Sequence, residues 1–149
     1  MDNATVKEKL AGVFTPMVTP FKDDEILYDG LAENVKKMNE TGLRGYFVLG
    51  TNGEFKSLSV EERMEVLKTV IKNAAPDKVV MAGTAAESTK ETIDITREAA
   101  KLGAEMVSLL MPHFFRKYMD DEALTDYIVK VADASPVPVL LYNNPSVAA

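Results

Sequence analysis

The sequence of 149 residues contains no cysteine, no tryptophan and a single histidine, His113. The absence of cysteine excludes disulfides, thiolate metal sites and thiol catalysis, although it says little about the cellular compartment. No run of apolar residues approaches the length that spans a bilayer, and the polar N-terminus lacks the apolar core of a signal peptide. We therefore expect a soluble, cytoplasmic protein with no membrane partner.

Positive charge is also scarce. The chain has 17 Lys and Arg against 23 Asp and Glu, for a formal net charge of -6, and its basic residues form no stripe. This balance argues against a nucleic-acid partner. The remaining composition, 46% hydrophobic and 27% charged, is that of an ordinary globular protein. The length and the absence of low-complexity segments predict one domain over residues 1–149, with no internal boundary.

Short apolar runs alternate with amphipathic segments along the chain. The runs predict five strands, at Val13–Thr19, Gly45–Leu49, Val79–Ala82, Met106–Met111 and Val137–Tyr142. The segments between them predict four helices, with apolar faces that include Leu31, Val35 and Met38; Met64, Leu67 and Ile71; Ile93 and Ala100 within Thr89–Leu102; and Leu124, Ile128 and Val131. Near-continuous apolar strands that alternate with helices indicate a parallel sheet covered by helices.

Capping residues support these helices. Ser59 with Glu62, and Ser88 with Glu91, fit the capping box in which a hydroxyl and a carboxylate satisfy free N–H groups. We expect Asp29 and Asp120 to be the N-caps of the other two helices, and Gly42 and Gly103 to end helices in a left-handed conformation. The pattern leaves two architectures open, a doubly wound open sheet and part of an eight-stranded barrel, and the length favours the open sheet.

The segment Gly50-Thr51-Asn52-Gly53-Glu54 directly follows an apolar strand. A glycine-rich turn at a strand end presents backbone N–H groups at one point, which suits a carboxylate or a phosphate, although such turns also serve only to reverse the chain. A second polar motif, Tyr142-Asn143-Asn144-Pro145, closes the last apolar run.

Four stretches together resemble the dihydrodipicolinate synthase and N-acetylneuraminate lyase family of pyruvate-handling class I aldolases. They are Val13–Phe21, Gly50–Glu54, Ala82-Gly83-Thr84 and Leu141–Pro145. Within the family, Gly50–Phe55, Glu87-Ser88-Thr89 and Val131–Pro136 are most similar to the 4-hydroxy-2-oxoglutarate aldolase branch. The resemblance implies a (β/α)8 TIM barrel, of which this chain holds about strands one to five and helices one to four, and homo-oligomers.

The resemblance also implies the chemistry. In the family, a lysine on strand six forms a Schiff base with pyruvate. The resemblance implies no cofactor. Tyr142 matches the tyrosine that handles protons, with the Thr51 hydroxyl as its partner. The N–H groups of Thr51 and Asn52, next to Gly50, would hold the pyruvate carboxylate. A phenol has an unperturbed pKa near 10, so it needs such a partner to work near neutrality.

Two departures limit this transfer. Phe114 stands where the family commonly has a tyrosine, so a Thr-Tyr-Tyr proton relay cannot be complete. Val147 stands where dihydrodipicolinate synthases have an arginine for the second substrate. The second departure argues against dihydrodipicolinate synthesis and favours an aldolase-type member, and a dihydrodipicolinate synthase proper remains an alternative.

None of the predicted strands carries a lysine. Lys22, Lys56 and Lys117 follow strands in polar loops, and Lys78 precedes the third strand, so none is expected to act as a desolvated amine. We therefore expect a lyase or aldolase-type protein for a 2-oxo acid such as pyruvate that is inactive as this chain alone. The alternative is a non-catalytic half-barrel that binds a small molecule or another protein.

The remaining candidate groups are weak. His113 follows Pro112 in a loop, where a histidine is more often incidental than catalytic. The acidic runs 23–25 and 120–122 have neither a histidine partner nor the ligand spacing of a metal loop, so they are interpreted as turns and helix caps. We expect no metal site.

Overall fold

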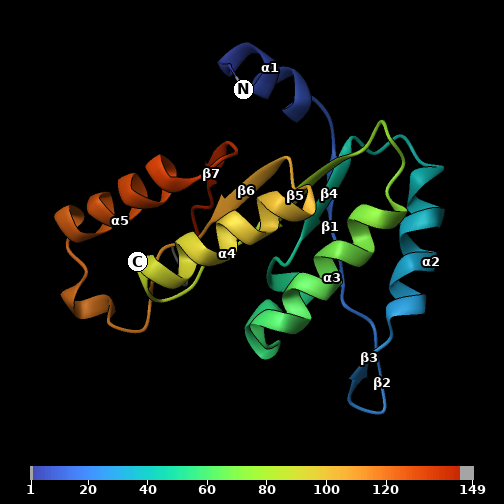
Figure 1. Ribbon diagram of the computed structural model, residues 1–149, viewed down its shortest axis with the longest axis horizontal. Coiled ribbons are helices and arrows are strands. Elements are labelled where there is room, and N and C mark those ends of the chain that lie inside the picture. The colour runs from blue at the N-terminus through green and yellow to red at the C-terminus, as the bar shows by residue number, and fades with distance from the viewer. Residues whose placement is uncertain (1, 145–149) are drawn as a thin grey trace.

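A computed structural model describes residues 2–144 of the protein. Its main sheet has five parallel strands, which lie side by side in chain order (Figure 1). These strands are β1 (Phe14–Pro16), β4 (Gly45–Val48), β5 (Val79–Gly83), β6 (Met106–Leu109) and β7 (Val139–Leu141). Each observed strand lies within or close to a predicted one, and β4 ends at Val48 because Leu49 takes a positive φ of 62°.

Four helices connect these strands and lie together on one side of the sheet (Figure 1). They are α2 (Tyr28–Asn39), α3 (Val60–Asn73), α4 (Thr89–Leu102) and α5 (Asp121–Ala134). Each of them packs against the next, α2 on α3, α3 on α4 and α4 on α5. None of the helices within residues 2–144 combines the length and apolar character that a bilayer crossing requires.

The order of the strands decides between the two architectures. A doubly wound sheet reverses its strand order at a switch point, whereas consecutive strands of a barrel are neighbours throughout. The order β1-β4-β5-β6-β7 contains no reversal, and all four pairings are parallel. The expectation from chain length, an open sheet, is therefore wrong, and the barrel arrangement implied by the resemblance is confirmed.

Three further elements have no counterpart in the sequence prediction. Helix α1 (Asn3–Leu10) buries no residue, so it leaves no apolar periodicity, and its N-terminus is capped by Asp2, which accepts a hydrogen bond from Thr5 N–H at 2.8 Å. The strands β2 (Phe21–Lys22) and β3 (Glu25–Ile26) form a small antiparallel hairpin. Lys22 therefore lies in a strand rather than a loop, although this strand is exposed and outside the main sheet.

The helix N-termini follow the predicted caps at three of four positions. Ser59 and Glu62 form the complete capping box of α3. Ser88 accepts a hydrogen bond from Glu91 N–H, which is the hydroxyl half of the predicted box, and Asp120 caps α5. Asp29 is not a cap, because α2 begins at Tyr28 with Leu27 at the N-cap position, which places Asp29 in the first turn.

One of the two predicted glycine ends is found. Gly103 ends α4 with a φ of 113° and donates its N–H to the carbonyls of Ala99 and Ala100. Gly42 does not end α2, since Glu40 already does so in a right-handed conformation. A predicted left-handed stop at Gly42 is therefore wrong.

The core lies between the sheet and the helices. Leu31, Val35 and Leu67 are buried in it as predicted, and Met38, Met64 and Ile71 pack against it. In α4 the fully buried residues are Thr92, Ile95, Thr96 and Ala99, whereas the predicted Ile93 is partly buried and packs against Leu109, Tyr127 and Val131. In α5, Val131 is buried as predicted, together with Tyr127, which the apolar pattern did not include.

A buried lysine, Lys78, hydrogen-bonds backbone carbonyls at the end of the sheet where the strands begin. Lys78, just before β5, donates from Nζ to the carbonyl oxygens of Thr41 at 3.1 Å and Leu43 at 2.9 Å, and Asp77 lies 3.2 Å from it. These carbonyls follow the C-terminal end of α2, where a cation is favourable. Lys78 therefore has a structural role. It precedes β5, at the opposite end of the strand from the carboxyl end.

We expect Lys78→Met to lower the free energy of unfolding by about 1–3 kcal/mol, because it leaves two carbonyl groups without their donor. Denaturant unfolding measures this change. The matched control is Lys72→Met, which removes an exposed lysine of α3 and should change stability by less than about 0.5 kcal/mol. Equal stability of the two variants would contradict a capping role for Lys78.

Candidate functional site

The carboxyl ends of four neighbouring strands surround one small cavity. It is lined by Phe47, Leu49, Gly50, Thr51, Phe55, Gly83, Ala85, Ser108, Leu110 and Tyr142. These residues come from β4, β5, β6 and β7 and from the segments that directly follow them. The cavity has a volume of about 10 Å³, which is the space that one water molecule needs. No charged side chain of residues 2–144 lines it.

The glycine-rich turn after β4 forms one wall of this cavity. It continues as two short helical turns, η1 (Thr51–Gly53) and η2 (Phe55–Ser57). The two non-glycine residues that flank η1, Leu49 and Glu54, have positive φ values of 62° and 54°. Such conformations are unusual for these residue types and concentrate at functional sites, so the turn is held by its surroundings.

Two close contacts hold the turn. The Thr19 hydroxyl, which is buried, donates a 2.8 Å hydrogen bond to the Gly53 carbonyl. A Cβ at Gly50 would lie 2.8 Å from the Phe47 ring, so this position requires glycine unless the ring moves. The turn is therefore held by one hydrogen bond from the segment after β1 and lies close to the Phe47 ring of β4.

The turn also leaves backbone donors available. The first hydrogen bond of η1 runs from Gly53 N–H to the Gly50 carbonyl, at 3.0 Å. The N–H groups of Thr51 and Asn52 precede this bond, so neither has a partner within η1. The side chains of Thr51 and Asn52 are exposed, whereas Gly50 is buried. This geometry can present two N–H groups to an anion at the mouth of the cavity.

Tyr142 reaches the same cavity from the end of β7. Its backbone N–H donates to the Leu109 carbonyl at 2.9 Å, which continues the pairing of β7 with β6. Its ring meets Phe47 edge to face, with the ring centres 6.3 Å apart and the planes at 79°. Tyr142 is 36% exposed, so its position is defined by backbone pairing and by one aromatic neighbour.

The structure thus brings three of the four predicted site residues together. Gly50, Thr51 and Tyr142 line the cavity, although they are far apart in the sequence. Asn52 lies next to them in η1 without lining the cavity itself. Within residues 2–144, no hydrogen bond joins the hydroxyl of Tyr142 to that of Thr51, so their partnership stays a prediction.

Other lining residues have no signal in the sequence. Ser108 is the one hydroxyl that β6 adds, and it is buried. Gly83 lets β5 approach β4 closely, because a Cβ there would collide with the Leu49 carbonyl oxygen. Only the parallel register, which pairs Gly83 with Ser108 and Val48 with Ala82, reveals that these residues share a site with Thr51.

Phe114 lies in the loop between β6 and α5 and not in the cavity. Its ring is 77% exposed and stacks edge to face on Phe115, with 5.0 Å between the ring centres. The neighbouring His113 faces Glu87, with His113 Nδ1 3.1 Å from Glu87 Oε1. His113 Nδ1 therefore lies close to a carboxylate without a hydrogen bond to it, a contact that its place in the sequence did not indicate.

The two acidic runs of the sequence lie apart from the cavity lining. Pro145 and Val147 lie outside the described residues. Asp23 and Asp24 form the turn of the β2–β3 hairpin with positive φ, and Asp120 caps α5, as interpreted from the sequence. Within residues 2–144, no three His, Asp or Glu side chains gather in a way that would hold a metal ion.

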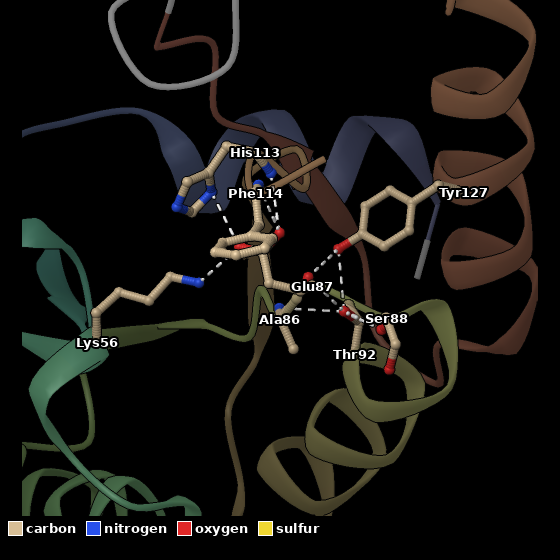
Figure 2. A network of polar contacts seen from close by, with 8 residues as sticks. All are labelled: Lys56, Ala86, Glu87, Ser88, Thr92, His113, Phe114 and Tyr127. Carbon is tan, nitrogen blue, oxygen red and sulfur yellow. Dashed lines mark hydrogen bonds and ion pairs between the residues drawn. The ribbon is translucent and has the colours of Figure 1, made fainter. Parts of the chain in front are cut away.

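Tyr127 is a buried tyrosine of α5 that contacts the loop after β5. It is 2% exposed, and its hydroxyl lies 3.0 Å from Thr92 Oγ1 and 3.4 Å from the Ala86 carbonyl, which it donates to (Figure 2). Burial raises the pKa of Tyr127 to about 12, and the negative charge of Glu87 adds to this shift while the hydrogen bond with Thr92 opposes it. The phenol is therefore a neutral, structural group that ties α5 to the loop after β5.

Comparison with known proteins agrees with this arrangement. The model of the dihydrodipicolinate synthetase family matches residues 9–149. A 4-hydroxy-tetrahydrodipicolinate synthase from Methanothrix thermoacetophila is 41% identical over 135 residues, which are 90% of this chain and 44% of that protein. The chain thus spans about half the length of the curated relatives that it matches.

Solved structures share the fold. A prophage protein of the dihydrodipicolinic acid synthase family from E. coli K12, solved in complex with pyruvate, is 30% identical with a TM-score of 0.86 and covers 92% of this chain and 46% of its own. An N-acetylneuraminate lyase from Mycoplasma synoviae is 28% identical with a TM-score of 0.84 and covers 94% of this chain and 48% of its own.

We expect Tyr127 to ionise near pH 12 rather than near its ordinary value of 10.0. Because the pKa is raised in the folded state, the stability that the neutral phenol contributes is complete below pH 10.0 and is lost as the pH rises toward 12. Titration of the phenolate absorbance in the parent chain and in Tyr127→Phe measures this group. Tyr118→Phe, which removes an 81% exposed tyrosine, is the control. Loss of a group that titrates near 10 in Tyr127→Phe would contradict the burial argument.

Proposed function

Because the chain belongs to the dihydrodipicolinate synthetase family, we propose that it forms the pyruvate-binding half of a class I aldolase-type lyase site. The observation that carries this proposal is the cavity that Thr51 and Tyr142 share. Thr51 follows β4 and Tyr142 follows β7, the two outer strands of the four that surround the cavity. In barrels of this kind, active sites lie at the carboxyl ends of the strands, where this cavity is found. The pyruvate bound in the E. coli relative supports a 2-oxo acid as the ligand.

The carboxylate of the acid is held at the mouth of the cavity. The cavity itself has space for about one water molecule, so a three-carbon acid rests beside Thr51 and Asn52 rather than on the cavity floor. Their two N–H groups point a positive dipole at the carboxylate, as backbone nests do for anions. No charged side chain of the described residues is needed for this step.

Tyr142 and Thr51 then handle the protons of the reaction. A phenol and a hydroxyl that share one small cavity can exchange a proton when the ligand brings their oxygens into hydrogen-bond distance. Apo geometry is often looser than this, so the absence of a direct hydrogen bond between the two hydroxyls in the described structure is compatible with the role.

The Schiff-base nucleophile is not provided by this chain. Lys78 lies at the opposite end of β5 and is engaged by two carbonyls, Lys56 is engaged by Glu87, and Lys22 lies in the exposed hairpin. No lysine within residues 2–144 lines the cavity. We infer that imine formation requires a strand-six lysine from further sequence. A cytoplasmic location and a homo-oligomer stay predictions.

The second substrate distinguishes two versions of this function. The name of the Methanothrix relative favours a 4-hydroxy-tetrahydrodipicolinate synthase. Val147, which stands where a synthase would have an arginine for its second substrate, favours an aldolase-type enzyme of the 4-hydroxy-2-oxoglutarate kind. We propose the aldolase type on this ground.

Pyruvate titration of the isotope-labelled chain tests the binding half. We expect the amide signals of Thr51 and Asn52 to shift, because their N–H groups face the carboxylate. Thr51→Val keeps both N–H groups and removes only the hydroxyl from the cavity, so it should weaken binding by at most about tenfold and leave the amide shifts in place. The control Thr125→Val alters an exposed threonine of α5 and should bind as the parent does. Shifts confined to other regions would contradict the proposed site.

Reduction with borohydride in the presence of pyruvate tests the missing nucleophile. We expect no covalent mass increase on this chain, because no described lysine reaches the cavity. A polypeptide that continues into a lysine-bearing sixth strand should gain the mass of the reduced adduct. An adduct on the 149-residue chain would overturn the inference about the nucleophile and leave the binding site intact.

A further inference from the structure

Glu87 makes an unusual set of contacts at the rim of the site. It lies in the loop between β5 and α4, and Figure 2 shows its carboxylate pointing at the loop between β6 and α5. Oε2 accepts hydrogen bonds from two successive backbone N–H groups, those of His113 and Phe114, each at 3.0 Å. Two adjacent amides on one carboxylate oxygen fix both the position and the direction of the chain.

The other oxygen of the carboxylate joins a third loop. Lys56, in η2 after β4, donates from Nζ to Glu87 Oε1 at 3.1 Å, and His113 Nδ1 lies 3.1 Å from the same oxygen. An ionised carboxylate has about four acceptor directions, and three of them are used by hydrogen bonds, from the two amides and from Lys56, whereas His113 Nδ1 makes no hydrogen bond within residues 2–144. Glu87 therefore connects the loops that follow β4, β5 and β6, which are also the loops that line the cavity.

The backbone next to Glu87 is itself held on both sides. Ala86 N–H donates to Thr92 Oγ1 at 3.1 Å, and the Ala86 carbonyl accepts from the Tyr127 hydroxyl at 3.4 Å (Figure 2). These neighbours are buried, so the carboxylate extends from a rigid support. A rigid support is what a residue needs if it is to set the position of another loop.

The loop after β6 depends on this anchor. Within residues 2–144, residues 113–119 make their hydrogen bonds to other parts of the chain through Glu87 alone, and their remaining backbone bonds are local turns. The aromatic side chains of this loop are exposed and contribute little burial. Without Glu87 the loop would lose its only polar connection to the rest of the described structure.

We propose that Glu87 is a positioning residue, which holds the loop after β6, and with it Phe114, against the loops after β4 and β5. The part of this proposal that does not depend on a ligand is that Glu87 anchors the two amides of His113 and Phe114. The part that concerns pyruvate rests on the proposed function, since the three loops that Glu87 joins also line the cavity, the loop after β6 through Leu110. Glu87 does not contact the ligand in this role and is not a catalytic residue.

Burial alone would raise the pKa of Glu87, but hydrogen bonds from Phe114, Lys56 and His113 outweigh it and hold the pKa below its usual value. This direction agrees with the geometry, because the anchor uses the ionised carboxylate. The groups that face it are Lys56 from η2, His113 from the anchored loop and Tyr127 from α5.

Amide hydrogen exchange, followed by NMR on the full 149-residue chain, tests the anchor. In Glu87→Ala we expect the amides of His113 and Phe114 to exchange at least about tenfold faster, while core amides such as those of Val48 and Val107 keep their rates. Glu87→Gln retains an oxygen acceptor, so it should give an intermediate rate. It also keeps the test valid if the alanine variant does not fold.

Two further variants separate the contacts. Lys56→Met removes the cation and leaves both amide bonds, so the His113 and Phe114 amides should stay protected. Glu98→Gln removes a carboxylate of α4 that only pairs with Lys101 on the surface, and it should leave all rates unchanged. Unchanged exchange of the His113 and Phe114 amides in both Glu87 variants would overturn the anchor.

Pyruvate titration of the same variants tests the consequence for the site. We expect Glu87→Ala to weaken pyruvate binding several-fold with the core amides still protected, and Glu87→Gln to recover part of the loss. Faster loop exchange with unchanged pyruvate affinity would overturn the positioning role. If the parent chain binds no pyruvate, the proposed function fails, whereas the exchange rates still decide whether Glu87 anchors the loop.

Discussion

The close approach of β4 and β5 is the constraint on which the rest of the structure depends. At Gly45 and Gly83 a Cβ would collide with carbonyl oxygens of the neighbouring strand, so only glycine permits this spacing. The spacing lets Leu49 leave β4 with a positive φ and begin the turn of η1 directly above the sheet. Because all strands are parallel, the same edge receives Ser108 from β6 and Tyr142 from β7. A shift of one residue in this register would send these side chains to the opposite face.

The chain pattern was sufficient to predict the strands, the four main helices and their alternation. It could not decide the strand order, because alternation of strands and helices is common to open sheets and barrels. The resemblance to a family supplied the barrel, and the sequential pairing confirms it. Helix ends were predicted where a side chain makes the cap, as at Ser59 and Asp120. The prediction failed at Asp29 and Gly42, where α2 begins and ends by backbone geometry alone.

The candidate site was predictable where motifs carry it and hidden where tertiary contacts create it. Gly50, Thr51 and Tyr142 belong to recognisable sequence motifs, and they meet at the cavity. Glu54 has a left-handed conformation that its residue type does not suggest, so no sequence pattern marks it. Tyr127 and Glu87 act through partners on other loops, and such pairings depend on register and loop length rather than on local sequence.

The carboxylate that we propose as ligand would meet a cavity that no charged side chain of residues 2–144 lines. Lys56 lies two residues after the glycine-rich turn in the sequence, and its ammonium donates to Glu87. The pair is partly exposed, so its attraction is screened and its main effect is to fix geometry. In the proposed site the N–H groups of Thr51 and Asn52 would face the carboxylate, so selectivity would depend on the shape of the turn. The Thr19 hydroxyl fixes that shape through its hydrogen bond to the Gly53 carbonyl, and the missing side chain of Gly83 leaves room for the Leu49 carbonyl at the start of the turn.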